Sequence, residues 1–221
     1  MANKVTEYYG RLLGLRYKSH PWHGLDIGPE APDIVTCYIE MVPLDTVKYE
    51  VDKVSGYLKI DRPQKYSNQV PCLYGFIPQT FSGELVSKFD TRENEDISGD
   101  GDPIDICVLT EKEISHGDIL VRARPIGSFR MIDNKQADDK IIAVLYNDAV
   151  FGEYKDITDV PPKVLDRLKH YFLTYKDLPG EERDCYITEV RGIEKTHELI
   201  KLSLEDYQKK FTGLESMLPE F

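Results

Sequence analysis

The sequence predicts an α+β domain that is mainly β, in which a small, highly twisted sheet or barrel is flanked by two helices. Short apolar runs separated by tight turns fill residues 35–60 and 104–146, a spacing typical of an antiparallel sheet or barrel. Two later stretches repeat apolar residues at every third or fourth position, as amphipathic helices do. With 221 residues the chain can form one sizeable core, and nothing in it suggests two domains.

The expected strands are apolar or alternating runs that are bounded by turn residues. They cover residues 35–42, 47–52, 57–60, 104–109, 119–125, 127–132, 140–146 and 186–190. Between them, residues 63–81 are expected to be rigid and irregular because prolines bracket Tyr74. Residues 82–99 are expected to form a polar surface loop or short excursion.

Two long helices and one short helix are expected. The short helix lies around residues 6–15. The first long helix begins at Thr158 with capping residues and a proline in its first turn, and it ends near Thr174. The second closes the chain, with apolar positions from Ile193 to Phe211. The single domain is divided into an N-terminal arm (1–34), a barrel with its helix (35–192), and a C-terminal helix and tail (193–221).

The charge, the apolar segments and the cysteines indicate the class and location of the protein. A net charge of −11 argues against non-specific binding to nucleic acid or to an anionic membrane, and it suits a site loaded with cations. No stretch resembles a signal peptide or approaches the roughly 20 apolar residues of a membrane span, so a cytoplasmic location is expected. The four cysteines form no Cys-x-x-Cys pair and are expected as buried free thiols in a reducing compartment.

The residues Asp100, Asp102 and Asp105 lie close together and lead directly into an apolar run. Ionised carboxylates this close repel one another, so the fold must supply positive charge, and divalent cations such as Mg²⁺ do so through oxygen ligands. Gly101 and Pro103 interrupt the alternation of a regular strand and allow the three side chains to point inward together. We therefore expect a turn that runs into a strand and carries a metal site.

Three other interpretations fit the same residues. A solvated Asp/Gly turn is the commonest meaning of such a stretch. An EF-hand is disfavoured because Ile104 and Asp105 occupy positions where it needs an oxygen ligand and a glycine. An aspartyl nucleophile for phosphate transfer is expected after a buried strand, whereas here the apolar run follows.

Further polar residues gather near the ends of other expected elements. They are Glu40, Lys48, Glu50, Arg62, Asp133, Asp138, Lys140, Tyr175 and Lys176. On pattern alone these are exposed strand faces and charged turns, and Tyr74 is a core residue. His20 and His23 have no further His or Cys beside them in the sequence, so an arm packed around Trp22 is favoured over a metal pair.

The run Asp100-Gly-Asp-Pro-Ile-Asp-Ile106 resembles the signature of the soluble family I inorganic pyrophosphatases, and shorter motifs agree in order over roughly residues 35–192. The resemblance implies hydrolysis of pyrophosphate to two orthophosphates on an OB-like barrel, by a metal-activated water and without a covalent intermediate. It implies about three or four Mg²⁺ in each active site, with Mn²⁺ or Zn²⁺ as substitutes. It also implies a homo-oligomer, with dimer and hexamer both open.

The resemblance assigns roles residue by residue. Asp102 matches the catalytic carboxylate that helps to activate the water. The matches to metal-binding carboxylates are Glu50, Asp100, Asp105, Asp133 and Asp138. The matches to substrate-binding residues are Lys48, Arg62, Tyr74, Lys140, Tyr175 and Lys176, and Glu40 matches a further active-site glutamate.

The chain departs from the family pattern in two places. Val70 stands where many compact bacterial members carry a tyrosine, so one hydrogen bond near the site is expected to be missing. The connection 75–99 is longer than in those members and resembles that of the larger, eukaryote-like branch.

The charges of the nominated residues fit this chemistry. Their seven carboxylates exceed the four cations Lys48, Arg62, Lys140 and Lys176 by three, so divalent cations are needed before a polyanion can bind. A non-catalytic protein that binds divalent cations or polyphosphate is the main alternative. A nucleotide-sugar transferase is a third interpretation, but no nucleotide-binding α/β half supports it.

Overall fold

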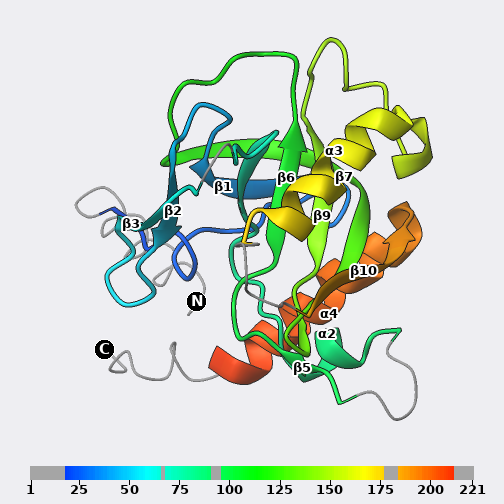
Figure 1. Ribbon diagram of the computed structural model, residues 1–221. Helices are drawn as coiled ribbons and strands as arrows, with labels where there is room; N and C mark the ends of the chain where they lie inside the picture. Colours follow the sequence, from blue (N-terminus) through cyan, green and yellow to red (C-terminus); the bar gives the residue numbers. More distant parts are fainter. Residues whose placement is uncertain (1–17, 66–67, 91–95, 177–183, 212–221) are drawn as a thin grey trace.

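The computed structural model describes residues 18–65, 68–90, 96–176 and 184–211. Its centre is a closed ring of five strands. In ring order they are β1 (Val35–Met41), β4 (Leu73–Phe76), β6 (Asp105–Leu109), β9 (Lys140–Leu145) and β7 (Ile119–Asp133), which pairs with β1 again. Only the β6–β9 pair of this ring is parallel. The predicted mainly β class and the twisted barrel are therefore confirmed (Figure 1).

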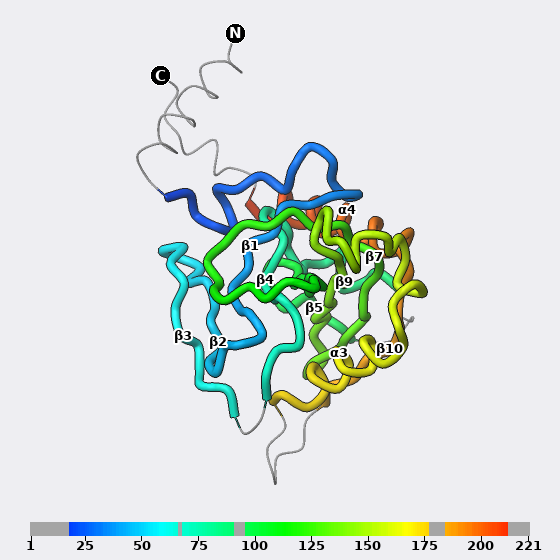
Figure 2. Tube along the Cα trace, turned by 90° about the horizontal axis from the view of Figure 1, so that it is seen from above, coloured from blue at the N-terminus to red at the C-terminus, as the bar shows by residue number. Residues whose placement is uncertain are grey.

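The remaining described elements surround the ring. A two-stranded hairpin consists of β2 (Val47–Val51) and β3 (Leu58–Pro63), and Figure 2 shows it beside β1. Three further strands extend the sheet: β5 (Ser98–Gly99), β8 (Gln136–Ala137) and β10 (Cys185–Arg191). The helices are α2 (Glu84–Lys88), the 3₁₀ turn η1 (Ile157–Asp159), α3 (Pro162–Thr174) and α4 (Ile193–Phe211).

The barrel strands are buried on both sides, because their alternate residues enter two different apolar clusters. On β6, Cys107 packs in the cluster that includes Phe172 of α3. Its neighbour Val108 packs in the cluster that includes Leu199 and Ile200 of α4. Successive side chains of a strand point to opposite faces, so one short strand anchors both long helices.

The N-terminal part of the described chain packs as expected around Trp22. This side chain is 4% exposed, and its Nε1 donates a hydrogen bond of 2.8 Å to the Thr80 carbonyl oxygen. The four cysteines are free thiols, three of them buried and Cys185 partly so. Within the described residues, no helix has both the length and the apolar character needed to cross a membrane. The helix expected around residues 6–15 lies outside the described residues.

Several predicted element boundaries were wrong. The two strands expected at 119–125 and 127–132 are one strand, β7, because a register shift after Pro125 allows pairing with β9 to resume at Gly127. The segment 63–81, expected to be irregular, contains β4. Its Gly75 permits the close approach to β1, since a Cβ there would lie 1.9 Å from the Tyr38 carbonyl oxygen.

Other expected loops also carry regular structure. The loop 82–99 contains α2 and β5, and the turn after Asp133 contains β8. Arg62 lies within β3 rather than just past a strand end. The helix expected from Thr158 begins only at Pro162, because Asp156 caps the separate turn η1 through a hydrogen bond from the Thr158 amide. These differences matter because β5 and β8 hold the acidic segments.

Candidate active site

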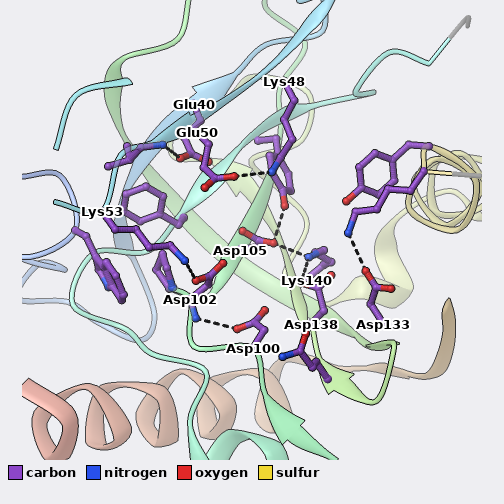
Figure 3. Close-up of a pocket in the computed structure, with 18 residues that line it drawn as sticks. Glu40, Lys48, Glu50, Lys53, Asp100, Asp102, Asp105, Asp133, Asp138 and Lys140 are labelled. Carbon is purple, nitrogen blue, oxygen red and sulfur yellow. Dashed lines mark hydrogen bonds and ion pairs between the residues drawn. The ribbon is translucent and has the colours of Figure 1, made fainter. Parts of the chain in front are cut away.

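A pocket of about 250 Å³ opens where the β2–β3 hairpin faces the ends of the barrel strands. Twelve of the thirteen nominated residues line it, and Figure 3 shows their carboxylates and amines pointing toward one another. The lining residues from the nominated set are Glu40, Lys48, Glu50, Tyr74, Asp100, Asp102, Asp105, Asp133, Asp138, Lys140, Tyr175 and Lys176. Arg62 is the exception.

The turn before β6 brings its three aspartates to the pocket, as the sequence predicted. Gly101 has φ +80°, a conformation that favours glycine, and the chain bends here between two of the aspartates. The Asp102 amide donates a hydrogen bond of 2.9 Å to Asp100 Oδ1. Asp105, the first residue of β6, accepts a 2.6 Å hydrogen bond from the Tyr74 hydroxyl.

Lys140 is the most deeply buried cation of the pocket. It begins β9, beside Asp105 in the parallel register, and its Nζ lies 2.5 Å from Asp105 Oδ2 and also contacts Asp138. Burial opposes its charge, but the carboxylates of Asp105 and Asp138 hold the pKa of Lys140 well above its usual value. This lysine therefore remains a fixed positive charge between two carboxylates.

Other lysines approach the remaining carboxylates from different elements. Lys48 Nζ lies 3.0 Å from Glu50 Oε2, and Lys176 Nζ lies 2.8 Å from Asp133 Oδ2. Lys53, in the turn after β2, forms an ion pair with Asp102. Sequence reasoning missed Lys53 because it placed this residue only in a hairpin turn; the one available signal was its position three residues after Glu50.

Two carboxylates lack such a partner within the described part of the chain. Burial, followed by the charge of Asp138, raises the pKa of Asp100 well above its usual value. Burial also raises the pKa of Glu40 to about 8, although a 2.7 Å hydrogen bond from the Val51 amide works against it. The pocket thus holds more carboxylate than the described cations neutralise.

The side of the pocket next to α3 carries donors. Tyr175 follows the last residue of α3, and the Arg62 guanidinium carbon lies 5.9 Å from the centre of its ring. Arg62 Nη2 is buried and has no hydrogen-bond partner among the described residues. A buried guanidinium nitrogen without an acceptor is costly, and an anionic oxygen would satisfy it. The structure therefore brings Arg62 to Tyr175 but not to the pocket wall.

Tyr74 is both a core residue and a pocket residue, the two alternatives that the sequence left open. Its side chain packs in an apolar cluster with Val70 and is 8% exposed, while its hydroxyl points into the pocket. Burial, followed by the charge of Asp105, raises the pKa of Tyr74 well above its usual value, so the hydroxyl stays a donor. Val70 is fully buried.

The donor set fits Mg²⁺. The acidic lining consists of carboxylates alone, which hard divalent cations prefer, and Asp100 and Glu50 reach the pocket from different elements. In the described residues, no three potential ligands already converge on one point. Magnesium tolerates this, because it keeps several waters and takes only one or two carboxylates at a time.

Comparison with known proteins identifies the family. The model of the inorganic pyrophosphatase family matches residues 37–208. The chain belongs to this family. A curated inorganic pyrophosphatase of Chlamydia caviae is 51% identical over 199 residues, which cover 87% of this chain and 92% of the relative. A soluble inorganic pyrophosphatase of Oryza sativa is 37% identical, over 86% of this chain and 79% of the relative.

Solved structures agree with this assignment. The inorganic pyrophosphatase of Thermus thermophilus superposes with a TM-score of 0.72 at 30% identity, covering 86% of this chain and 99% of that one. That of Helicobacter pylori gives a TM-score of 0.69 at 31% identity, covering 83% and 98%. The predicted family and OB-like fold are confirmed, and the protein is an enzyme that hydrolyses inorganic pyrophosphate.

Proposed function

We propose that the enzyme hydrolyses pyrophosphate to two orthophosphates at this pocket in a Mg²⁺-dependent reaction, by direct attack of water. The observation that carries the proposal is the charge of the lining. Seven carboxylates face the four lysines Lys48, Lys53, Lys140 and Lys176. Glu40, with a pKa of about 8, is protonated near neutral pH, but the other carboxylates still outnumber the lysines, so the pocket repels a polyanion until cations are added. A covalent intermediate is not needed, because a water can attack the phosphorus directly.

The carboxylates that would hold Mg²⁺ are Glu50, Asp100, Asp105, Asp133 and Asp138. Bound Mg²⁺ supplies two things: it neutralises the phosphate charge, and it lowers the pKa of water toward neutrality. Mn²⁺ and Zn²⁺ accept the same oxygen ligands and are expected as substitutes.

Asp102 is the proposed general base. Its side chain is 42% exposed at the pocket, so a water molecule can reach it, and a carboxylate in direct contact can take the water's proton. Its ion pair with Lys53 orients the carboxylate. The nearby Glu40, bound to the Val51 amide, keeps the floor of the pocket polar.

The donors on the other side would bind the two phosphoryl groups. Lys48, Lys140 and Lys176 supply point charges, and the planar guanidinium of Arg62 can contact two phosphate oxygens at once. The Tyr74 and Tyr175 hydroxyls add neutral donors. Charge that develops on the leaving phosphate is stabilised by these same groups.

Orthophosphate release tests the proposal. The purified chain is incubated with pyrophosphate and Mg²⁺, with and without EDTA, beside ATP and a phosphate monoester. We expect fast release from pyrophosphate alone and complete loss of release in EDTA. Comparable release from the monoester would refute the substrate assignment. Binding of cations or polyphosphate without release in Mg²⁺, Mn²⁺ or Zn²⁺ would instead favour the non-catalytic alternative.

We also propose that the enzyme works in the cytoplasm as a homo-oligomer. The proposal of oligomers is supported by exposed apolar side chains such as Val54, Tyr57 and Ile60 on the hairpin, which are 92%, 71% and 62% exposed. Light scattering of the purified chain, which gives its mass in solution, tests this directly.

A further inference from the structure

The segment 82–99, which was expected to form a surface loop or short excursion, contacts the acidic segments of the site through a buried serine. Ser82 is 3% exposed and lies at the start of the loop 82–99. Its hydroxyl donates a 3.1 Å hydrogen bond to the Ala137 carbonyl oxygen and accepts one of 3.4 Å from the Asp100 amide. One hydroxyl therefore contacts both acidic segments of the pocket.

The backbone of Ser82 strengthens the same connection. Its amide donates a 2.8 Å hydrogen bond to the Asp102 carbonyl oxygen, and its carbonyl accepts one of 3.1 Å from the Gly101 amide. The chain also approaches closely here: a Cβ on Gly99 would lie 2.1 Å from the Ser82 carbonyl oxygen. Ser82 therefore contacts each residue of the turn from Gly99 to Asp102.

The second acidic segment is held at the same place. Strands β5 and β8 pair in parallel, with Gly99 opposite Ala137, and Asp138 follows directly. Asp100 and Asp138 follow the paired residues Gly99 and Ala137 directly and both line the pocket, so their like charges repel each other. A fixed connection between their backbones must resist that repulsion.

The helix α2, which follows Ser82, is fixed by hydrogen bonds away from the pocket. The buried Asp206 of α4 accepts hydrogen bonds of 2.9 and 3.0 Å from the Leu85 and Val86 amides at the start of α2. At the other end of α2, Arg130 donates a 2.7 Å hydrogen bond to the Ser87 carbonyl oxygen. Figure 1 shows α2 beside α4, and Ser82 precedes this fixed helix by only two residues.

We propose that Ser82 is a positioning residue for the metal site, which holds the backbones bearing Asp100 and Asp138 at the separation that a divalent cation requires. The inference rests on the proposed Mg²⁺ dependence and adds a residue to it. Groups that orient metal ligands from behind typically change metal affinity about 10- to 100-fold when they are removed.

The test uses Ser82→Ala and Mn²⁺ binding to the full chain, measured by calorimetry. Because the two backbone hydrogen bonds of Ser82 remain, we expect an increase of about tenfold in the dissociation constant, at the low end of that range. Pyrophosphate hydrolysis should then need more Mg²⁺ for half-saturation, while kcat at saturating Mg²⁺ stays within about twofold of wild type.

Ser203→Ala is the matched control. Ser203 is also buried, and its hydroxyl donates a 2.7 Å hydrogen bond to the Ile200 carbonyl oxygen within α4. This variant should lose some thermal stability but keep wild-type Mn²⁺ affinity. Unchanged affinity in Ser82→Ala, or equal weakening in both variants, would overturn the proposal.

Two further outcomes have clear meanings. If Ser82→Ala does not fold, Ser82→Cys keeps a side chain of similar size with a weaker donor, and it must weaken Mn²⁺ binding or the proposal is wrong. If the wild-type chain releases no orthophosphate from pyrophosphate, the proposed function fails, while the Mn²⁺ affinities still decide the role of Ser82.

Discussion

Asp138 and Asp139 are neighbours in the chain, yet they belong to two very different charged clusters. Asp139 is fully buried, with Arg130 Nη1 at 2.5 Å and Arg191 Nη1 at 3.0 Å from its two oxygens. Asp138 points to the pocket, where it shares Lys140 with Asp105. Alternate side chains of an extended segment point to opposite sides, which separates the two.

The two clusters differ in whether one sign of charge is in excess. Around Asp139 the charges balance, because Arg191 also pairs with Asp90 and Glu189, which share Lys195. The arginines also donate hydrogen bonds to carbonyl oxygens of the α2 segment, including that of Phe89. Around Asp138 the carboxylates are in excess. A buried charge must be paired within the protein, so the first cluster is complete in itself. In the second cluster, added cations can neutralise the excess carboxylates, which is what a cation-dependent site requires.

The largest expected effect concerns the pocket. Asp102→Asn should lower kcat by about 10²- to 10⁴-fold, because an amide cannot take the water's proton. The fold should persist, since this side chain is 42% exposed. Steady-state kinetics and circular dichroism measure the two effects. A variant with near-normal kcat would remove Asp102 from the role of general base.

The next prediction compares the two neighbours directly. Asp139→Asn should lower the free energy of unfolding by about 3–5 kcal/mol, because it leaves two buried arginines without their shared carboxylate. Asp138→Asn is the matched control and should cost much less, since the buried Lys140 keeps Asp105 as a partner and the repulsion between the two carboxylates is removed. Urea denaturation measures both. Equal losses would mean that the two clusters do not differ in kind.

The pH dependence of stability provides a further test of the unpaired carboxylates in the pocket. Folded Glu40 has a pKa of about 8 against an ordinary 4.5, so between these values the folded chain holds a proton that the unfolded chain has released. The stability that Glu40 contributes is complete below pH 4.5 and is lost as the pH rises toward 8. Without metal, Glu40→Gln should flatten this fall by up to about 1.4 kcal/mol per pH unit. Urea titrations from pH 5 to 8 in EDTA measure the slope, and an unchanged slope would contradict the prediction.

The smallest expected effect belongs to Lys53. Lys53→Met removes a positive charge from the pocket lining, so Mn²⁺ affinity should rise by up to about fivefold, as expected for a half-exposed charge. Calorimetry measures the affinity. Lys59→Met is the control, because Lys59 pairs with Asp52 and does not line the pocket. Weaker Mn²⁺ binding in Lys53→Met would show that this lysine supports the site instead.

The sequence predicted that the acidic turn before β6 would face a common site, because the type and close spacing of its residues can be recognised locally. Asp100, Asp102 and Asp105 were expected to face a common site, and they do. Ser82 and Lys53 were missed for a physical reason. A serine in a polar loop and a lysine in a hairpin turn have no local pattern that separates them from ordinary surface residues.

The sequence also failed to predict the boundaries of several strands. Strands β5 and β8 have two residues each, and they exist only because they pair with each other across a long sequence separation. The continuity of β7 through Pro125 likewise depends on its partner β9. Such short or interrupted strands have little intrinsic preference, so pairing decides them.

By itself, the sequence indicated the mainly β class, the apolar faces of α3 and α4, and an acidic turn at Asp100, Asp102 and Asp105, because periodicity and residue type are local properties. Only the tertiary structure decided which carboxylate is paired and which is left in excess. The separation of Asp138 from Asp139, and the connection of Asp100 to Ala137 through Ser82, depend on groups brought together from distant parts of the chain. Electrostatic pairing acts across space, and no local pattern encodes it.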